Sequence, residues 1–202
     1  MKYVGPKVRL SRQLGVPLTP KAARIMDKKA YPPGQHGRYK QFRRKESDYK
    51  KQLQEKQKLR YQYNIHERQL RNYFKKASSR TGNTVDILIQ LLETRLDAVV
   101  FRAGLARTIY AARQYVSHGH ITVNGNRVNI PSYNVALGDV VAVREKSQKI
   151  PCFTDAIETT GAPPEYIERS VEDMSAKLLA LPDRADVPII GEMSLVIEFY
   201  SR

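Results

Sequence analysis

The most restrictive feature of the chain is the segment 94–143, where the spacing of apolar side chains changes from a helical period to a strand period. Apolar residues recur at helical spacing from 96 to 103 and again within 107–117, and Gly104 is placed to end the first stretch. After Gly119 the apolar side chains alternate, and Asn124-Gly125 provides the positive-φ pair of a tight hairpin turn. A further strand is expected at 140–143. The segment predicts two short helices that lead into a small antiparallel sheet, with a core of Leu96, Val99, Val100, Ala103, Ile109, Ala112, Val116, Ile121 and Val123.

The polar faces of these two helices form the first candidate binding surface. Arg95 and Arg102 share one flank of the first helix, and Arg107 and Gln114 share the face of the second helix that lies opposite its apolar stripe. Cations on such faces can lie against a phosphate backbone. A basic helix face is also common as a plain solvated surface, and the helices alone leave that alternative open.

Residues 95–125 carry the pattern RLDxxVxRxGxAxTxxxARQxVxHGHIxVNG, which resembles the RNA-binding domain named after small-subunit ribosomal protein four. Pro131-Ser132 and Gly138-Asp139 continue the pattern, and EFYSR at 198–202 resembles the C-terminus of that ribosomal protein. The resemblance covers nearly the whole chain. It implies a structural protein of the small ribosomal subunit that binds ribosomal RNA early in assembly, clamps a junction of several RNA helices and contributes to translational accuracy.

The distribution of charge independently favours a polyanionic partner. The chain has 35 Lys and Arg against 20 Asp and Glu, a net charge of +15 at pH 7. Residues 1–60 hold 18 basic and 4 acidic side chains, whereas residues 150–202 hold 4 basic and 10 acidic ones. Binding to nucleic acid releases counterions from phosphates, so it should weaken steeply with salt. We expect the N-terminal and middle parts to face phosphate, and the acidic C-terminal part to turn away or to contact a basic protein.

Residues 1–45 are expected to form an irregular basic arm, because glycine and proline repeatedly interrupt any helix. Only residues 20–28 have the signals of a helix, with Thr19 as N-cap and Pro20 at the first helical position. The segment 31–45 joins a Pro-Pro turn to a run of cations interleaved with Tyr39 and Phe42. Such a segment can order on RNA by phosphate pairing and aromatic stacking, and a disordered basic tail without a specific partner is the alternative.

The cysteine content limits metal and redox chemistry. Cys152 is the single cysteine, which excludes an internal disulfide and a multi-cysteine zinc site. Many members of the family that the chain resembles carry a zinc cluster of cysteines near the N-terminus, but YPPGQHG at 31–37 resembles the cysteine-free variant. The resemblance therefore implies no metal and no cofactor. No signal-peptide pattern and no apolar run of about 18 residues occurs, so no membrane partner is expected.

The remaining segments divide the chain into domains. Residues 46–92 are expected to form a helical domain, with helices at 46–63, at 65–77 and after an Asn83-Thr84 cap. Residues 93–157 form the RNA-binding domain, and residues 158–202 an acidic extension that packs as strands, with strand patterns at 166–171 and 194–200. A short helix is expected at 153–160. The predicted fold class is α+β: an irregular basic N-terminal arm, a helical domain, and a small helix-helix-hairpin domain with a mostly antiparallel sheet.

Three classes of function compete. The first is a structural ribosomal protein; the second is an RNA-modifying enzyme, because the same small domain is appended to pseudouridine synthases and to a tyrosyl-tRNA synthetase; the third is a DNA-binding helix-turn-helix regulator. The residues beyond 150 are too few for a catalytic domain, and no phosphate-binding glycine loop, metalloprotease helix or nucleophile elbow occurs. The basic arm suits a folded RNA better than a single major groove. We therefore expect a non-enzyme.

The resemblance also implies partners and a location. The partners are small-subunit ribosomal RNA, ribosomal protein five of the small subunit at a surface tied to decoding accuracy, and messenger RNA where it enters the subunit. The location is the ribosome, in a bacterial cytoplasm or a plastid stroma. The residues expected to contact RNA are Arg9, Arg12, Lys21, Arg24, Lys28, Lys29, Arg38, Tyr39, Lys40, Arg43, Arg44, Lys45, Lys50, Lys51, Arg95, Arg102, Arg107, Thr108, Arg113, Gln114, Ser117, His118, His120 and Asn124.

Overall fold

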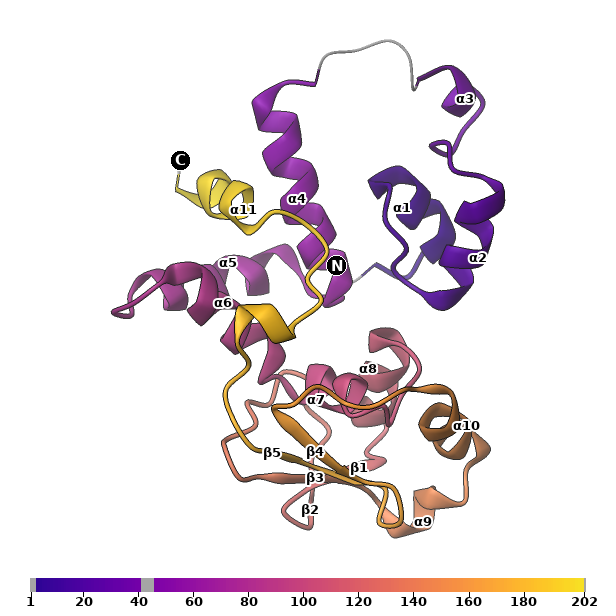
Figure 1. Ribbon diagram of the computed structural model, residues 1–202, viewed down its shortest axis with the longest axis vertical. Helices are drawn as coiled ribbons and strands as arrows, with labels where there is room; N and C mark the ends of the chain where they lie inside the picture. Colours follow the sequence, from indigo (N-terminus) through magenta and orange to yellow (C-terminus); the bar gives the residue numbers. More distant parts are fainter. Residues whose placement is uncertain (1–2, 41–45, 202) are drawn as a thin grey trace. The chain divides into compact units, whose positions relative to one another are not determined.

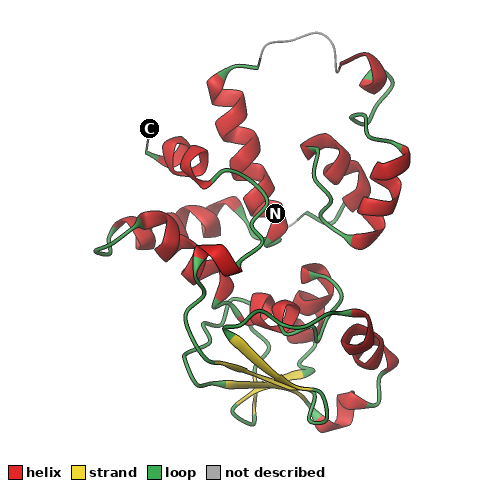
Figure 2. Cartoon of the chain, in the orientation of Figure 1, coloured by secondary structure: helices red, strands yellow, loops and turns green. Residues whose placement is uncertain are grey.

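The computed structural model describes residues 3–40 and 46–201, and the chain divides into two compact units. The first unit is Met1–Lys75 with Ile189–Arg202, and the second is Lys76–Pro188. Within the described residues, the strands all lie in the second unit, and the first unit is built from helices (Figures 1 and 2). The predicted α+β class is confirmed.

The helices and strands follow one another in a simple order. The first unit contains α1 (Lys7–Leu14), α2 (Pro20–Lys28), α3 (Gly37–Lys40), α4 (Asp48–Gln62), most of α5 (Glu67–Ser78) and α11 (Met193–Tyr200). The second unit contains α6 (Thr84–Glu93), α7 (Leu96–Arg102), α8 (Ile109–Ser117), β1 (Ile121–Val123), β2 (Asn126–Arg127), β3 (Val140–Val143), α9 (Glu145–Gln148), α10 (Pro151–Thr159), β4 (Ile167–Ser170), β5 (Ser175–Leu178) and a 3-10 turn at Arg184–Asp186.

The N-terminal arm holds more helix than the sequence predicts. The helix expected at 20–28 is confirmed as α2, and the Thr19 hydroxyl accepts a hydrogen bond from the backbone N–H of Ala22 at 3.2 Å. The expectation of irregular structure is wrong for residues 7–14, which form α1. Pro6 stands at the N-cap of α1, and Gly15 ends it in the left-handed region at φ 72°. The proline and the glycine mark the two ends of this helix and do not interrupt it.

A small core and one buried hydroxyl hold α1 and α2 in the arm. Leu10 of α1 and Ala22 of α2 are both buried. The Ser11 hydroxyl donates to the backbone carbonyl of Lys7 at 2.9 Å and accepts from the backbone N–H of Leu18 at 3.2 Å, which closes the connection between the two helices. The arm is therefore a packed substructure over residues 7–28, and its cations are carried on helices.

The C-terminal segment contradicts the expected strand at 194–200, because it forms the helix α11, which lies beside α4 (Figure 1). Met193 and Val196 are buried at a spacing of three, which is a helical period, whereas alternation would have buried every second residue. The Glu198 carboxylate accepts a hydrogen bond from Gln52 of α4 at 2.8 Å. The helices expected at 46–63, at 65–77 and after the Asn83 cap are confirmed as α4, α5 and α6.

In the second unit, α7 and α8 cover one face of a five-stranded sheet (Figure 1). The strand order is β2-β1-β3-β5-β4, and every neighbouring pair is antiparallel. The expected hairpin turn is confirmed, with Asn124 at φ 49° and Gly125 at φ 80°. The strand patterns at 140–143 and 166–171 are confirmed as β3 and β4, and the helix expected at 153–160 as α10. The strand β5, which pairs between β3 and β4, is not predicted by the sequence pattern.

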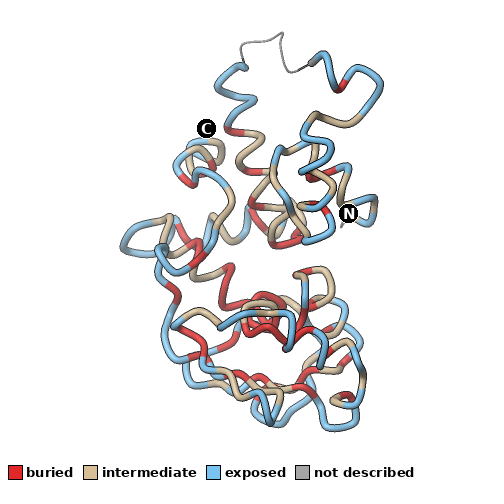
Figure 3. Tube along the Cα trace, turned by 45° about the vertical axis from the view of Figure 1, so that its right-hand side comes forward, coloured by how far each residue is buried: buried red, intermediate tan, exposed pale blue. Residues whose placement is uncertain are grey.

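The core of the second unit lies between the two helices and the sheet. All nine of its predicted core residues are buried, with exposed fractions of 5% or less. In Figure 3 the buried parts of this unit gather along α7, α8 and the strands. This packing fixes α8 with its apolar side inward and its polar side outward. No helix in the described part of the chain is long and apolar enough to cross a membrane.

Candidate nucleic-acid interface

The outer face of α8 is the most compact set of predicted contact residues. Thr108 caps the helix, and its hydroxyl accepts from the backbone N–H of Ala111 at 3.1 Å. Arg107, Gln114, Ser117 and His118 are exposed, and the last three recur at helical spacing on one face. The structure thus brings these four predicted side chains together on one solvent-facing surface, which we call the α8 face, whereas the Thr108 hydroxyl is used by the helix itself.

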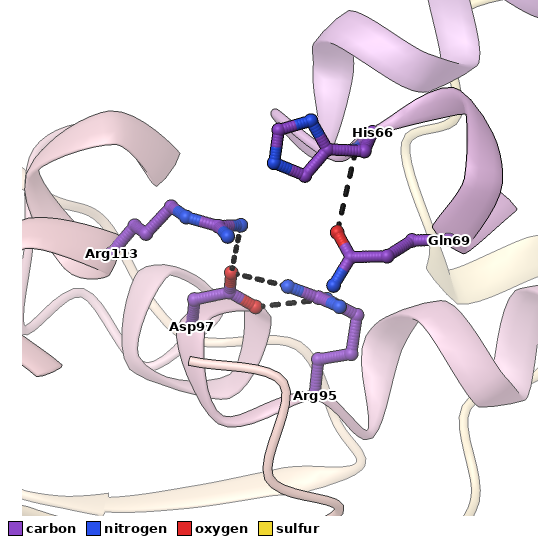
Figure 4. A network of polar contacts seen from close by, with 5 residues as sticks. All are labelled: His66, Gln69, Arg95, Asp97 and Arg113. Carbon is purple, nitrogen blue, oxygen red and sulfur yellow. Dashed lines mark hydrogen bonds and ion pairs between the residues drawn. The ribbon is translucent and has the colours of Figure 1, made fainter. Parts of the chain in front are cut away.

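Arg95 and Arg113 converge on one buried carboxylate, Asp97 of α7 (Figure 4). Arg95 donates to Asp97 through Nε at 3.0 Å and Nη2 at 2.6 Å, and Nη1 of Arg113 donates at 3.3 Å. The Asp97 side chain is fully buried, and that of Arg95 is 1% exposed. Burial raises the pKa of Asp97, and the two guanidinium charges oppose that shift, so the carboxylate depends on both arginines to stay ionised.

A second buried network engages Arg102. Its guanidinium forms hydrogen bonds to both oxygens of Glu93, the shortest at 2.7 Å, and the Tyr166 hydroxyl donates to the same carboxylate at 3.1 Å. The Glu93 side chain is fully buried, and that of Arg102 is 11% exposed. Burial and the neighbouring Glu93 charge raise the pKa of Tyr166, which therefore stays a neutral donor.

These two networks correct the sequence-based view of three arginines. Arg95 offers no side-chain surface to a phosphate, and Arg102 and Arg113 offer little, since their side chains are 11% and 12% exposed. Their roles in this structure are to join α6, α7 and α8 into one core. The sequence could not reveal this, because the carboxylates that bind them are recognisable only once the helices are packed.

The hairpin residue Asn124 is likewise occupied by structure. Its side-chain amide donates to the Asp139 carboxylate at 2.8 Å, and its side-chain oxygen accepts from the backbone N–H of Val140 at 2.9 Å. These bonds tie the turn to the start of β3. Asn124 therefore shapes the hairpin, although the residue as a whole is exposed.

Two cations that the sequence did not single out lie beside His118 and His120. The Arg127 guanidinium of β2 lies against Gly119, close to where a β-carbon on that glycine would stand. Arg144, which follows β3, donates its backbone N–H to the carbonyl of His120 at 2.8 Å. Nδ1 of His120 is 3.0 Å from the Ser147 hydroxyl oxygen. Burial and then the charges of His118, Arg127 and Arg144 lower the pKa of His120, so its ring is neutral at neutral pH.

In the first unit, α2 carries three of the predicted contact cations on its exposed side. Lys21, Arg24 and Lys28 recur at helical spacing on its exposed side, and Lys29 follows at the C-cap. Arg9 of α1 is also exposed. None of these five forms an ion pair within the described residues. We call the side of α2 that carries Lys21, Arg24 and Lys28 the α2 face.

Arg12 and Arg38 both contact the ring of Tyr31. Arg12 lies 4.8 Å from the ring centroid and donates to the carbonyls of Tyr31 at 3.1 Å and Pro32 at 3.4 Å, which shows that it holds this turn. Arg38 lies 5.0 Å from the centroid and donates to the Tyr31 hydroxyl at 3.4 Å. That hydrogen bond, together with the surrounding cations, lowers the pKa of Tyr31. Arg38 remains exposed, whereas Arg12 is half-buried and binds the turn through Nε and Nη2.

The other predicted residues of the first unit are less constrained. Tyr39 is 73% exposed. Lys50 and Lys51 form surface ion pairs with Glu46 at 2.6 Å and Asp48 at 3.1 Å, and such pairs are weak enough to be exchanged for a phosphate. The Lys40 side chain, and all of Arg43, Arg44 and Lys45, lie outside what the structure describes.

Potential metal ligands do not gather anywhere in the described parts of either unit: no group of three or more His, Cys, Asp or Glu side chains is placed to hold an ion. Cys152 is free and half-buried. It stands beside Tyr115, whose pKa is raised to about 12 by burial and by the cysteine. The chemistry that the accessible residues offer is therefore the binding of anions by cations, and the α2 face, the α8 face and the cations around His120 all offer it.

Comparison with known proteins agrees with this geometry. Residues 2–93 match the family model described as the ribosomal protein S4/S9 N-terminal domain, and residues 94–141 match the S4 domain. The chain thus combines a ribosomal N-terminal domain with the small module that contains α7, α8 and the hairpin.

Curated relatives identify the family over the full length. The chain is 47% identical to small ribosomal subunit protein uS4 of Thermobifida fusca over 100% of both chains. It is 48% identical to the protein of that name from Parabacteroides distasonis and 46% identical to that from Geobacillus stearothermophilus, in each case over 100% of this chain and 99% of the relative. The chain belongs to the small ribosomal subunit protein uS4 family, which confirms the resemblance seen in residues 95–125.

Proposed function

We propose that the protein is a structural component of the small ribosomal subunit that binds ribosomal RNA and carries out no catalysis of its own. The observation that carries this proposal is the full-length similarity to small ribosomal subunit proteins, at 46–48% identity. The accessible cations supply the physical means, because they lie on rigid helices and need no reorganisation to meet a phosphate backbone.

The two units contribute separate contact surfaces to this proposal. In the first unit we assign RNA contact to the α2 face, with Arg9, Lys29 and Arg38. In the second unit we assign it to the α8 face, which adds a polar amide and a hydroxyl to the charge of Arg107. A protein that binds RNA at two places can hold two RNA segments together. In this way it would clamp a multi-helix junction and nucleate assembly of the subunit.

We extend the proposal to the finer roles that the family resemblance implies. These are contact with ribosomal protein five of the small subunit, contact with messenger RNA where it enters, a contribution to translational accuracy, and work in the ribosomes of a bacterial cytoplasm or a plastid stroma. The acidic side chains of residues 150–202 support a contact with a basic protein, because they repel RNA.

Binding measurements with designed variants test the core proposal. The intact protein should bind the 5′ domain of small-subunit ribosomal RNA more tightly than a DNA duplex of equal charge, with a margin that persists between about 50 and 300 mM salt. Arg24→Glu with Lys28→Glu, and separately Arg107→Glu, should each weaken RNA binding by about tenfold or more. Lys177→Glu on β5 is the matched control and should leave it unchanged. Equal, wholly salt-sensitive binding to RNA and DNA would contradict a specific ribosomal role.

A further inference from the structure

Three segments of the second unit meet at the C-terminal end of α8. His118 and Gly119 end the helix, His120 leads into β1, and Arg127 and Arg144 come from β2 and from the end of β3. Thr122 pairs with Arg127 in the β1–β2 ladder. Arg127 therefore lies on the strand next to β1, which begins directly after His120. The β1–β2 ladder and the backbone hydrogen bond from Arg144 to the carbonyl of His120 therefore hold this group together.

Gly119 gives Arg127 its position. The glycine adopts φ 73°, and its missing side chain leaves room for the guanidinium directly against the backbone. The C-terminal end of a helix carries partial negative charge, so a cation is stabilised there without consuming a hydrogen-bond partner. The guanidinium is thus held in place while its donors remain available.

The charges of Arg127 and Arg144 are not neutralised within the described residues, where neither guanidinium forms an ion pair or a side-chain hydrogen bond. Both line an open hollow of about 710 Å³, together with Thr122 of β1 and Ala142 of β3. Lys146 lines the same hollow, as do the carboxylates of Glu145, Glu172 and Asp173, which belong to α9 and to the β4–β5 turn.

His120 lies within the influence of both guanidinium groups. Burial lowers its pKa most, and the charges of Arg127 and Arg144 act in the same direction, as does His118. Its other ring neighbours are Tyr115 and Phe153, both uncharged, and its Nδ1 faces the Ser147 hydroxyl. Two guanidinium groups without an ion-pair partner in the described residues thus act on one imidazole ring, and this arrangement suits an anion placed beside them.

We infer that Arg127 and Arg144, with His118 and His120 between them, form a phosphate-binding site that takes a phosphodiester of RNA. The inference rests on the proposed RNA-binding function and adds to it, because it carries the contact surface from the α8 face around the end of the helix onto the sheet. Two guanidinium groups, one on β2 and one on the residue that follows β3, can each donate to a different phosphate oxygen, which fixes the position of the RNA backbone.

Neutral substitutions separate this site from the rest of the RNA surface. Arg127→Gln and Arg144→Gln should each weaken binding to the 5′ domain of small-subunit ribosomal RNA by about three- to tenfold at low salt. Each should also lower the slope of log affinity against log salt by about 0.7–0.9, the value for one lost phosphate contact. Lys177→Gln and Arg184→Gln, exposed cations of the same unit, are the matched controls and should leave the slope unchanged.

The imidazole signal of His120 gives an independent readout. A bound phosphate favours the protonated ring, so NMR titration of the full chain should show the pKa of His120 move upward when RNA, or inorganic phosphate at high concentration, is present. In Arg127→Gln with Arg144→Gln this upward movement should be smaller, whereas the signals of His36 and His66 should not respond to the substitutions.

The possible outcomes distinguish the inference from the proposed function. If the native protein fails to bind ribosomal RNA, the proposed function fails. If the native protein binds RNA but the folded double variant keeps the native salt slope and the native response of His120, only the Arg127–Arg144 site is overturned. Retained RNA affinity together with lost binding to an acidic peptide would assign the site to a protein carboxylate and would likewise overturn the inference.

Discussion

Replacing Asp97 by asparagine should destabilise the second unit strongly, although the side chain keeps its shape. The Asp97 carboxylate is the partner of two arginines, and the Arg95 side chain, at 1% exposure, has no access to water. Removing one member of a buried ion pair leaves the other charge uncompensated, at a cost of about 3–5 kcal/mol. That is a large share of the roughly 5–15 kcal/mol by which domains are stable.

Urea unfolding followed by circular dichroism measures this loss, and Asp48→Asn is the matched control. The Asp48 side chain is 85% exposed in its pair with Lys51, so its replacement should cost less than about 1 kcal/mol. Because the two units can unfold separately, hydrogen exchange at the amides of α7 and α8 should locate the effect of Asp97→Asn.

A double-mutant cycle sharpens the argument about Asp97. Arg95→Met alone should also destabilise, but the combination with Asp97→Asn should cost less than the sum, because the second change removes the charge that the first leaves stranded. The reasoning is refuted if Asp97→Asn costs no more than Asp48→Asn, or if the two changes at 95 and 97 are additive.

Three further predictions concern charge, and each has its own assay. Arg107→Glu should weaken RNA binding without changing the urea midpoint. Arg113→Glu should lower the urea midpoint, because it places a second carboxylate beside buried Asp97. Equal effects of the two substitutions on the midpoint would contradict the different exposure of the two arginines. Burial opposes ionisation of Glu67, but hydrogen bonds from Tyr200 and Lys56 and the charge of Arg60 hold its pKa below the ordinary value. The stabilising contribution of Glu67 is therefore present above the unfolded pKa, near 4.3, and is lost as pH falls through the folded pKa. Glu67→Gln should accordingly make stability fall less steeply as pH is lowered. The effect should be less than about 1 kcal/mol, because the Glu67 side chain is 40% exposed. Tyr200→Phe removes the 2.7 Å hydrogen bond to Glu67 and should speed hydrogen exchange in α11, while Tyr39→Phe, at a residue that is 73% exposed, serves as the control.

Local signals in the sequence predicted those elements whose ends are set by their own residues. The Thr19 cap, the Asn83 cap and the Asn124-Gly125 turn each act within a few residues, and the elements that they bound were predicted closely. The helix α1 was missed because Pro6 and Gly15 were counted as interruptions, although a proline before a helix and a glycine after it are its usual punctuation.

Elements defined by distant partners were harder to predict. Apolar side chains recur at every second position in the segment 194–200, as they do in a strand. The segment forms a helix because it packs against α4, which lies more than a hundred residues earlier in the chain. Likewise, only two of the four residues of β5 are apolar, which is a weak strand pattern. The segment is a strand because it forms backbone ladders with β3 and β4 on either side. Tertiary context overrides local pattern in both cases.

The arginines of the candidate interface also divide by whether the packed fold gives them a carboxylate partner. Arg95, Arg102 and Arg113 stand in the most recognisable part of the sequence pattern, yet each is bound by a carboxylate inside the fold. Arg107 lies in the same pattern and faces solvent, and it forms no ion pair with the residues that the structure describes. Whether an arginine binds the fold or an external phosphate therefore depends on the carboxylates that the fold places beside it. A pattern of basic residues predicts that a surface binds RNA, and the buried Asp97 and Glu93 decide which of those residues remain free to do so.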